Sequence, residues 1–311
     1  MKSKVELHRS LSPHRSFRPT NKHNKPRPAA IPTTWQLVKQ TFALIGQAKA
    51  PFIGVTLLFL ILTLLVVGTS TQSDYLGLKD AVAQTFGGDS VSRAGSLLTT
   101  LLGGALTPQM TEGQQFILFT SEFLLFLAAI WIARQVLSGN KPTIAQALFN
   151  SPTPFVSTLT VFGVLALQLL PAGIGVYVLS VASTGGFLSY AAFGLLLGFL
   201  AFLLCLLSLY LITTTLVGLA IVTLPGMYPL AALGSAKQLV IGRRASVLVR
   251  LVGGALWILL LWCLVLFPFL LLDNSVNTEA VPYIPFALQA LTGFSLLFAP
   301  LYLYRLYRSL L

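Results

Sequence analysis

The chain contains 95 consecutive residues, from Pro142 to Ala236, without a single Asp, Glu, Lys or Arg. A water-soluble domain needs charged residues over its surface, and ordinary globular chains contain roughly 25% of them. Here charged residues make up 9% of 311 residues, whereas 55% are hydrophobic. The sequence therefore predicts an all-α integral membrane protein that crosses the bilayer several times.

Six apolar segments are each long enough to cross a hydrocarbon core, which takes about 20 helical residues. They lie near Phe52–Thr71, Phe116–Leu137, Phe155–Val181, Ala191–Leu224, Val247–Leu272 and Ile284–Leu303. The fourth is too long for one perpendicular span, so it either tilts or leaves part of Thr213–Leu224 at the interface. We therefore expect six transmembrane helices.

Lys and Arg are sorted between the two sides of these spans. Ten lie before Pro51 and two lie in the first connection, residues 72–115. The second and fourth connections contain two and four, the third and fifth contain none, and the C-terminus contains two. Alternate sides of the membrane thus hold 18 and 2 basic residues. Because Lys and Arg favour the cytoplasmic side, we expect a multi-pass protein of the cell membrane with both termini in the cytoplasm. Residues 72–115 are then the only sizeable external loop.

Residues 1–31 differ in character from the six-span domain, residues 32–311. The first 30 residues contain eight Lys or Arg and four Pro. Such a segment cannot bury enough apolar surface to offset the entropy of ordering it, which predicts a disordered cytoplasmic tail. The tail either lies against an anionic leaflet or serves only to fix the orientation of the protein.

A short amphipathic stretch precedes each outgoing span. The first two begin with Thr33–Gln36 and Thr143–Gln146, a spacing at which the hydroxyl and the amide cap free backbone N–H groups. The third runs from Pro229 to Arg244. We expect three short helices in the cytoplasmic interface, with their apolar faces toward the membrane. The apolar face of the first helix comprises Trp35, Val38, Phe42 and Ile45, and that of the third comprises Leu230, Leu233 and Val240. The residues expected to contact anionic headgroups are Lys237, Arg243 and Arg244.

This arrangement has two interpretations. In the first, the chain consists of three repeated helical hairpins, each made of an interfacial helix, a span out and a span back. The match between Ile45-Gly46-Gln47 and Ile241-Gly242-Arg243 supports it. In the second, any cytoplasmic connection before an outgoing span tends to be basic and amphipathic, and no repeat exists.

Several segments resemble a known group of proteins. They are Ile130–Gln135 followed by Lys141-Pro142-Thr143, then Leu167–Pro171, and Val222–Leu230 continuing to Arg243-Arg244. This pattern is similar to a group of uncharacterised bacterial six-span integral membrane proteins and, more distantly, to the membrane domain of glycerophosphodiester phosphodiesterases. The resemblance implies a fold over residues 33–308. It implies no catalytic residues, because the soluble phosphodiesterase domain has no counterpart in this sequence.

Glu122 is the only acidic residue inside a predicted span. A charge at the centre of a membrane helix costs about 2.5–3.5 kcal/mol, so such residues usually face protein or a wet cavity. Glu122 is therefore a candidate for a proton or cation site, or for contact with a cationic substrate. The alternative is that Glu122, six residues into its span, reaches the headgroup water at the external interface.

Gln168 lies three residues before Pro171 in the third span. Proline removes a backbone donor and frees a carbonyl group, which a neighbouring polar side chain can satisfy. Either the helix breaks here and opens a cavity, or it has an ordinary kink and Gln168 bonds to another helix. In the fourth span, the spacing of Gly194 and Gly198 predicts a close-packing face.

Several classes of function have no support in the sequence. All three histidines lie in the first 23 residues, and Cys205 and Cys263 lie in apolar runs without a CxxC pair. No phosphate-binding loop, nucleophile elbow or zinc-protease motif occurs in a suitable context. We therefore expect no metal, no cofactor, no nucleic-acid partner and no enzymatic activity.

Two functions remain open. The first is a non-enzymatic polytopic membrane protein whose basic cytoplasmic helices engage anionic lipid or a membrane-protein partner. The second is a transporter or accessory permease for a small or lipidic solute, with a polar cavity near Glu122, Gln168 and Pro171.

Overall fold

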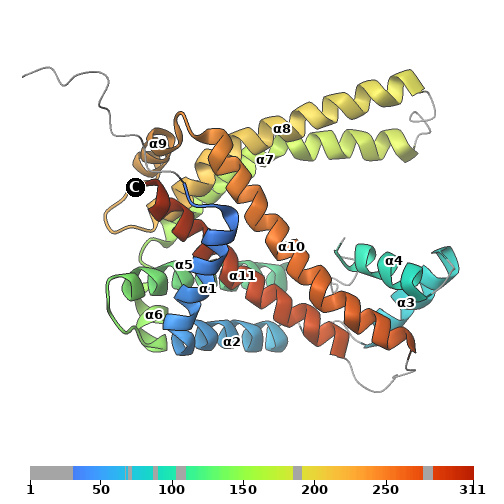
Figure 1. The fold of residues 1–311 in the computed structure, drawn as a ribbon, viewed down its shortest axis with the longest axis horizontal. Helices are drawn as coiled ribbons and strands as arrows, with labels where there is room; N and C mark the ends of the chain where they lie inside the picture. The colour runs from blue at the N-terminus through green and yellow to red at the C-terminus, as the bar shows by residue number, and fades with distance from the viewer. Residues whose placement is uncertain are drawn as a thin grey trace, which may run out of the picture. The chain divides into compact units, whose positions relative to one another are not determined.

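The computed structural model describes residues 31–66, 68, 72–86, 90–102, 110–184, 191–275 and 283–311. Within these ranges the regular structure is entirely helical, which confirms the predicted all-α fold (Figure 1). Six helices are long and apolar enough to cross a membrane: α2 (Lys49–Val66), α5 (Glu112–Leu137), α7 (Phe155–Thr184), α8 (Ala191–Val222), α10 (Arg244–Ser275) and α11 (Tyr283–Leu310). The chain is a polytopic membrane protein. The predicted disordered tail, residues 1–31, lies outside the described residues except for Ile31.

Local hydrogen bonds lie at the ends of two predicted spans. α2 is described to Val66, and Gly68 adopts a left-handed conformation, with φ of 78°, in which its N–H bonds to the carbonyl of Leu64; residues 67 and 69–71 of the predicted span lie outside the described residues. α5 begins at Glu112, four residues before the predicted start, because Thr111 and Gln114 form a capping box. Glu122 is thus the eleventh of 26 residues in its helix.

The segment predicted as an external loop, residues 72–115, contains two helices, α3 (Gln72–Phe86) and α4 (Ser90–Leu102). In α4, Ala94, Leu97 and Leu101 are buried at helical spacing, and they form a cluster with Leu270 of α10 and Ile284 of α11. The Ser, Thr and Gly residues between them lower the apolar content of the segment. The sequence predicted only a connection between spans here, whereas the spacing of these three residues is that of a helix.

Three short helices precede the first, third and fifth spans, as predicted: α1 (Thr34–Gln47), α6 (Ile144–Asn150) and α9 (Pro229–Val240). The capping boxes at Thr33 and Thr143 are both present. α1, α6 and α9 lie at the same end of the described bundle as the end of α11 (Figure 1). We call this end, which also contains Arg134, Lys237 and Arg244, the basic end.

The predicted membrane-facing side of α1 is partly wrong, because Val38 is buried against the protein while Trp35 and Phe42 are exposed. The helix buries Leu37, Val38, Thr41 and Leu44, whereas Trp35 is 52% exposed and Phe42 is 40% exposed. These two rings lie at the edges of the helix, where Trp35 contacts Trp257 of α10 edge-on and Phe42 contacts Phe298 of α11. α1 is therefore packed between the spans as well as across their ends.

Of the side of α9 predicted to face the membrane, Leu230 is exposed, whereas Val240 is buried against the protein. α9 buries Ala232, Ala236 and Val240, and Leu230 is 81% exposed. Small residues allow α9 to approach α8 so closely that a Cβ atom on Gly218 would lie 3.1 Å from Leu233. Leu230 points away from the bundle, where a membrane would cover it.

The repeat hypothesis has mixed support. Each hairpin has the predicted order of short helix, span and span, which supports the repeat. The matched glycines differ in backbone conformation, which does not support it: Gly242 has a φ of 78°, whereas Gly46 lies in the helix α1 without a positive φ. The three hairpins as repeats of one unit stay a prediction.

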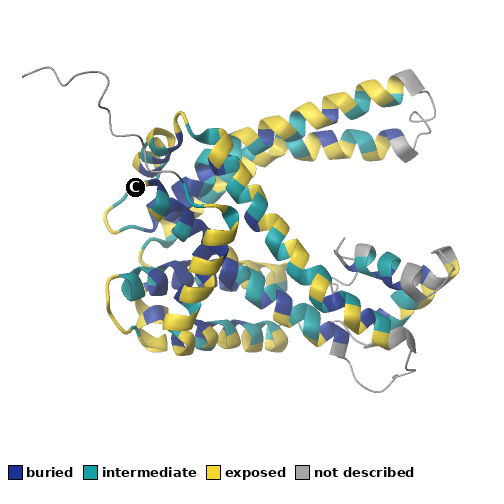
Figure 2. Ribbon diagram, viewed as in Figure 1, coloured by how far each residue is buried: buried dark blue, intermediate teal, exposed yellow. Residues whose placement is uncertain are grey.

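Buried residues gather around α5 and α11, and exposed apolar residues cover α7 and α8 (Figure 2). Two arginines join elements at the basic end. Nη1 of Arg134 donates to the carbonyl of Thr223 over 2.9 Å, which holds the end of α8 against α5. Nε of Arg250 donates to the carbonyl of Pro32 over 3.2 Å, which ties α10 to the start of α1.

α7 and α8 form a long uncharged hairpin. α7 continues through Pro171 as one helix, so of the two alternatives for this segment the break does not occur. The close contact in this hairpin lies at Gly175, where an added Cβ atom would be 3.2 Å from the backbone of Ala201. Around Gly198 there is open space, so this glycine makes no close contact within the described chain.

Candidate functional site

A small recess at the basic end brings together residues from four helices. Its volume is about 210 Å³, and its described lining comprises Gln168, Tyr210, Leu211, Thr214, Thr215, Leu233, Lys237 and Arg244. We call it the basic recess. It contains Gln168, which the sequence predicted as a cavity residue, and two of the three predicted headgroup contacts, Lys237 and Arg244.

The local fold explains why these side chains meet. Tyr210 and Thr214 are four residues apart and lie on one face of α8. The close packing of α9 on α8 brings Lys237 to the same face. A tight turn follows α9, with Gly242 at φ 78°, and directs the chain into α10, whose first residue is Arg244.

Two contacts fix the polar groups of the recess. The guanidinium carbon of Arg244 lies 4.7 Å from the centre of the Tyr210 ring, a cation–π geometry. Oγ1 of Thr215 donates a hydrogen bond of 2.6 Å to Oε1 of Gln168. The bond leaves the amide N–H₂ of Gln168 as a donor, and Arg244 and Lys237 add donors with positive charge. None of the described lining residues is acidic. The recess is therefore suited to an anion with several acceptor oxygens.

Arg243 does not line the basic recess, although it is adjacent to Arg244 in sequence. The two residues differ because Arg243 belongs to the turn and Arg244 begins α10. The sequence grouped Lys237, Arg243 and Arg244 as headgroup contacts, and the structure brings only the first and the last together.

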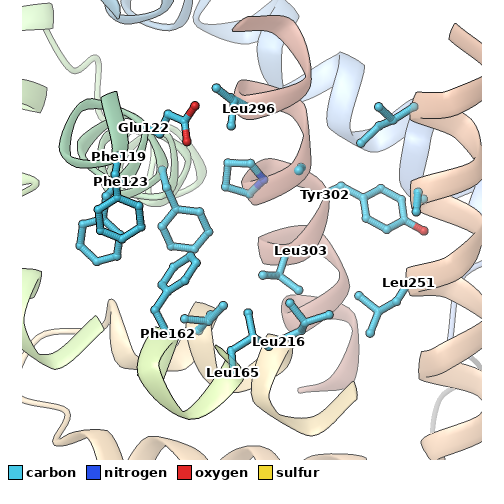
Figure 3. Close-up of a pocket in the computed structure, with 17 residues that line it drawn as sticks. Phe119, Glu122, Phe123, Phe162, Leu165, Leu216, Leu251, Leu296, Tyr302 and Leu303 are labelled. Carbon is cyan, nitrogen blue, oxygen red and sulfur yellow. The ribbon is translucent and has the colours of Figure 1, made fainter. Parts of the chain in front are cut away.

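A second cavity lies between five of the spans (Figure 3). Its volume is about 350 Å³, and its described lining comprises Phe119, Glu122, Phe123, Phe126, Phe162, Leu165, Leu216, Leu219, Leu251, Gly254, Ala255, Ile258, Leu296, Ala299, Pro300, Tyr302 and Leu303. We call it the phenylalanine cavity. Glu122 is the only charged residue in this lining.

Glu122 and Gln168 line different cavities, and Pro171 lines neither of them. The single polar cavity predicted near these three residues is therefore not formed by the described residues. The physical reason is the tilt of the hairpin: the face of α7 that carries Phe162 and Leu165 meets α5, while Gln168 bonds to α8.

Sequence reasoning missed several residues of both cavities. Phe119, Phe123 and Phe126 recur at helical spacing, which is a signal that could have identified one wall of the phenylalanine cavity. Tyr210 gave no such signal, since a single tyrosine in an apolar helix is equally typical of a lipid-facing position.

A third, more polar pocket of about 600 Å³ lies between the ends of α5 and α8 and the α6–α7 turn. Its lining includes Trp131, Arg134, Gln135, Ser151, Thr223 and Tyr228. Arg134 already donates a hydrogen bond to the carbonyl of Thr223, so its guanidinium group has a structural role in holding α8 against α5.

Metal-ligating residues do not cluster in the part of the chain that the structure describes: no group of three or more His, Cys, Asp or Glu lies close enough to hold an ion. No protein-family model, no curated protein and no solved structure matches this chain.

Proposed function

We propose that this chain is a non-enzymatic multi-pass protein of the cell membrane that binds the phosphate group of anionic lipids in the basic recess. The observation that carries the proposal is the convergence of Lys237 and Arg244 with Gln168 in one recess that has no acidic residue in its described lining. Charge-assisted hydrogen bonds from such donors are about twice as strong as neutral ones.

The position of the recess supports a lipid as the source of the phosphate. It lies beside α9, whose exposed Leu230 would rest in the acyl-chain region next to the headgroups. Its volume of about 210 Å³ suits a headgroup phosphate, whereas drug-sized ligands occupy roughly 300–1,000 Å³. Each basic residue near an anionic leaflet contributes about 1 kcal/mol of attraction.

In this proposal the basic end faces the cytoplasm. The support is the sorting of 18 basic residues to one side of the spans and 2 to the other. The basic tail and the three short helices would then contact the same anionic leaflet as the basic recess. A basic end of this kind could also bind a membrane-protein partner with an acidic surface. We do not propose a transporter with one site at Glu122, Gln168 and Pro171, because these residues do not share a cavity.

Lipid counting by native mass spectrometry tests the proposal. The full chain is purified in a nonionic detergent and mixed with equal amounts of phosphatidylglycerol and phosphatidylcholine. The wild type should retain phosphatidylglycerol preferentially. Arg244→Gln and Lys237→Gln should each weaken its retention about fivefold, the equivalent of ~1 kcal/mol per charge.

Arg243→Gln is the matched control. It removes the same charge one residue away, outside the lining of the recess. It should keep most of the phosphatidylglycerol preference. Equal losses in Arg243→Gln and Arg244→Gln would show that general surface charge attracts the lipid, and the proposed site would be wrong.

A further inference from the structure

The phenylalanine cavity combines one acidic group with an otherwise apolar wall. Glu122 projects from α5 across the cavity toward Leu296 of α11 (Figure 3). The described residues provide neither an ion pair nor a hydrogen bond for its carboxylate. An unpaired carboxylate in such surroundings is costly. A positively charged ligand would remove this cost.

Helix α11 contributes a proline to the cavity wall. Pro300 has no backbone N–H, so the carbonyl group of Leu296 has no donor four residues later in α11. Both residues line the cavity. The α11 wall of the cavity thus contains a backbone carbonyl without its usual helical donor.

Aromatic rings form the adjoining wall. Phe162 of α7 packs edge-on against Phe123 and Phe126 of α5, with ring centres 5.3 and 5.6 Å apart. Phe119 stacks on Phe123 and is itself 47% exposed. The faces of aromatic rings attract cations and also provide apolar contact.

The size and the composition of the cavity exclude a bare metal ion as the natural occupant. Its volume of about 350 Å³ falls in the range of sites for organic ligands. A hard cation such as Ca²⁺ takes six to eight oxygen ligands. Besides Glu122 the described lining contains one oxygen-bearing side chain, Tyr302, whose hydroxyl group donates to the carbonyl of Arg250.

The exposed part of the cavity lining includes apolar residues. Ala255 of α10 and Phe119 of α5 are exposed lining residues. Beyond them, large apolar side chains continue in the exposed state along α8 and α10, such as Leu203, Leu256 and Leu259. In a bilayer these residues face acyl chains, so a ligand would enter from the lipid and must itself be lipophilic.

From these observations we infer that the phenylalanine cavity binds a lipophilic organic cation, with Glu122 as the counter-charge and the phenylalanine rings as the apolar wall. This site is separate from the basic recess, and its charge preference is the opposite one. The inference stands or falls independently of anionic-lipid binding.

Two probes of matched size and opposite charge test it: tetraphenylphosphonium and tetraphenylborate. Binding of each to the detergent-purified full chain is measured by equilibrium dialysis. The wild type should bind the phosphonium at least about tenfold more tightly than the borate. Glu122→Gln should lose most of this preference, because it keeps the shape of the side chain and removes the charge.

Three further variants make the result decisive. Glu112→Gln removes an acid at the start of the same helix, outside the cavity, and should bind like the wild type. Glu122→Asp keeps the charge and should keep the preference for the cation. Ala255→Phe adds bulk to the exposed part of the lining and should weaken phosphonium binding. The inference is overturned if both probes bind equally to the wild type, or if Glu122→Gln binds the phosphonium as tightly as Glu112→Gln does.

Discussion

Individual hydrogen bonds made by polar side chains hold α7 and α8 together. Besides the bond from Thr215 to Gln168, the backbone N–H of Ala172 donates to Oγ of Ser208 over 3.0 Å. Ala172 follows Pro171, where the helical bonding pattern is disturbed. In a bilayer these groups have no water as an alternative partner. A segment of 95 residues without charge thus still contains polar contacts that fix the register of its two helices.

Thr215→Val tests this register at the scale of one bond. We expect the free energy of unfolding to fall by about 0.6 kcal/mol and by at most ~1.7 kcal/mol, the range measured for such bonds in membrane proteins. Reversible unfolding in SDS, in a double-mutant cycle with Gln168→Leu, measures the coupling. Thr213→Val is the control, since Thr213 bonds to Leu209 within its own helix. If the coupling free energy of Gln168 with Thr213 were as large as that with Thr215, the assigned bond would be wrong.

Gln168 also shows how far a single residue can be interpreted from sequence. Its polarity in an apolar helix, just before Pro171, predicted a hydrogen bond to another helix, and this is confirmed. The recess that it lines could not be predicted, because Lys237 and Arg244 reach it only through the packing of α9 on α8. Glu122 is the converse case: its chemistry was evident in the sequence, and its cavity depends on the placement of four other helices.

At the scale of elements, close approaches between spans depend on glycine. An added Cβ atom on Gly254 of α10 would lie 2.6 Å from the ring of Tyr302 in α11. The hydroxyl group of the same tyrosine donates a bond of 2.7 Å to the carbonyl of Arg250. The backbone of α10 and the Tyr302 ring are thus in direct contact without space for a side chain.

Gly254→Ala should therefore destabilise the protein by roughly 1–3 kcal/mol, the usual cost of overpacking. Gly163→Ala in α7 should have the opposite effect, about 0.5–1 kcal/mol of stabilisation, because open space surrounds Gly163 and alanine favours a helix. Thermal unfolding in detergent compares the two variants. A neutral or stabilising Gly254→Ala would show that Tyr302 is not held against α10.

Helix starts were more predictable than helix faces. Thr33 with Gln36, and Thr143 with Gln146, determine the starts of α1 and α6 through local bonds alone, so the sequence was sufficient there. The buried face of α9 depends on the neighbouring helix. Ala232 and Ala236 are buried because small residues permit contact with α8, and Val240, which was predicted to face the membrane, is buried with them.

At the scale of the whole molecule, the six spans could be predicted because the length of an apolar run is a local property. The two cavities could not, since their walls combine helices that are distant in sequence. The exposed apolar surface of α7 and α8 and the buried positions of α5 and α11 likewise result from packing, not from composition (Figure 2). The distribution of Lys and Arg between alternate connections is the one long-range property that can be counted from the sequence, with 18 basic residues on one side of the spans and 2 on the other.

This sorting predicts the orientation of the whole chain, which cysteine labelling in intact cells can measure. In a background with Cys205→Ala and Cys263→Ala, single cysteines are introduced at three exposed positions: Gln115, Asn140 and Leu311. A membrane-impermeant maleimide should label Gln115→Cys in intact cells. It should label Asn140→Cys and Leu311→Cys only after permeabilisation, because six crossings bring the chain back to the basic side. Labelling of Asn140→Cys and Leu311→Cys from opposite sides would require an odd number of crossings between them and would refute the six-span topology. Complete reversal of the pattern would keep the spans and refute the cytoplasmic orientation, and with it the contact of the basic recess with the anionic inner leaflet.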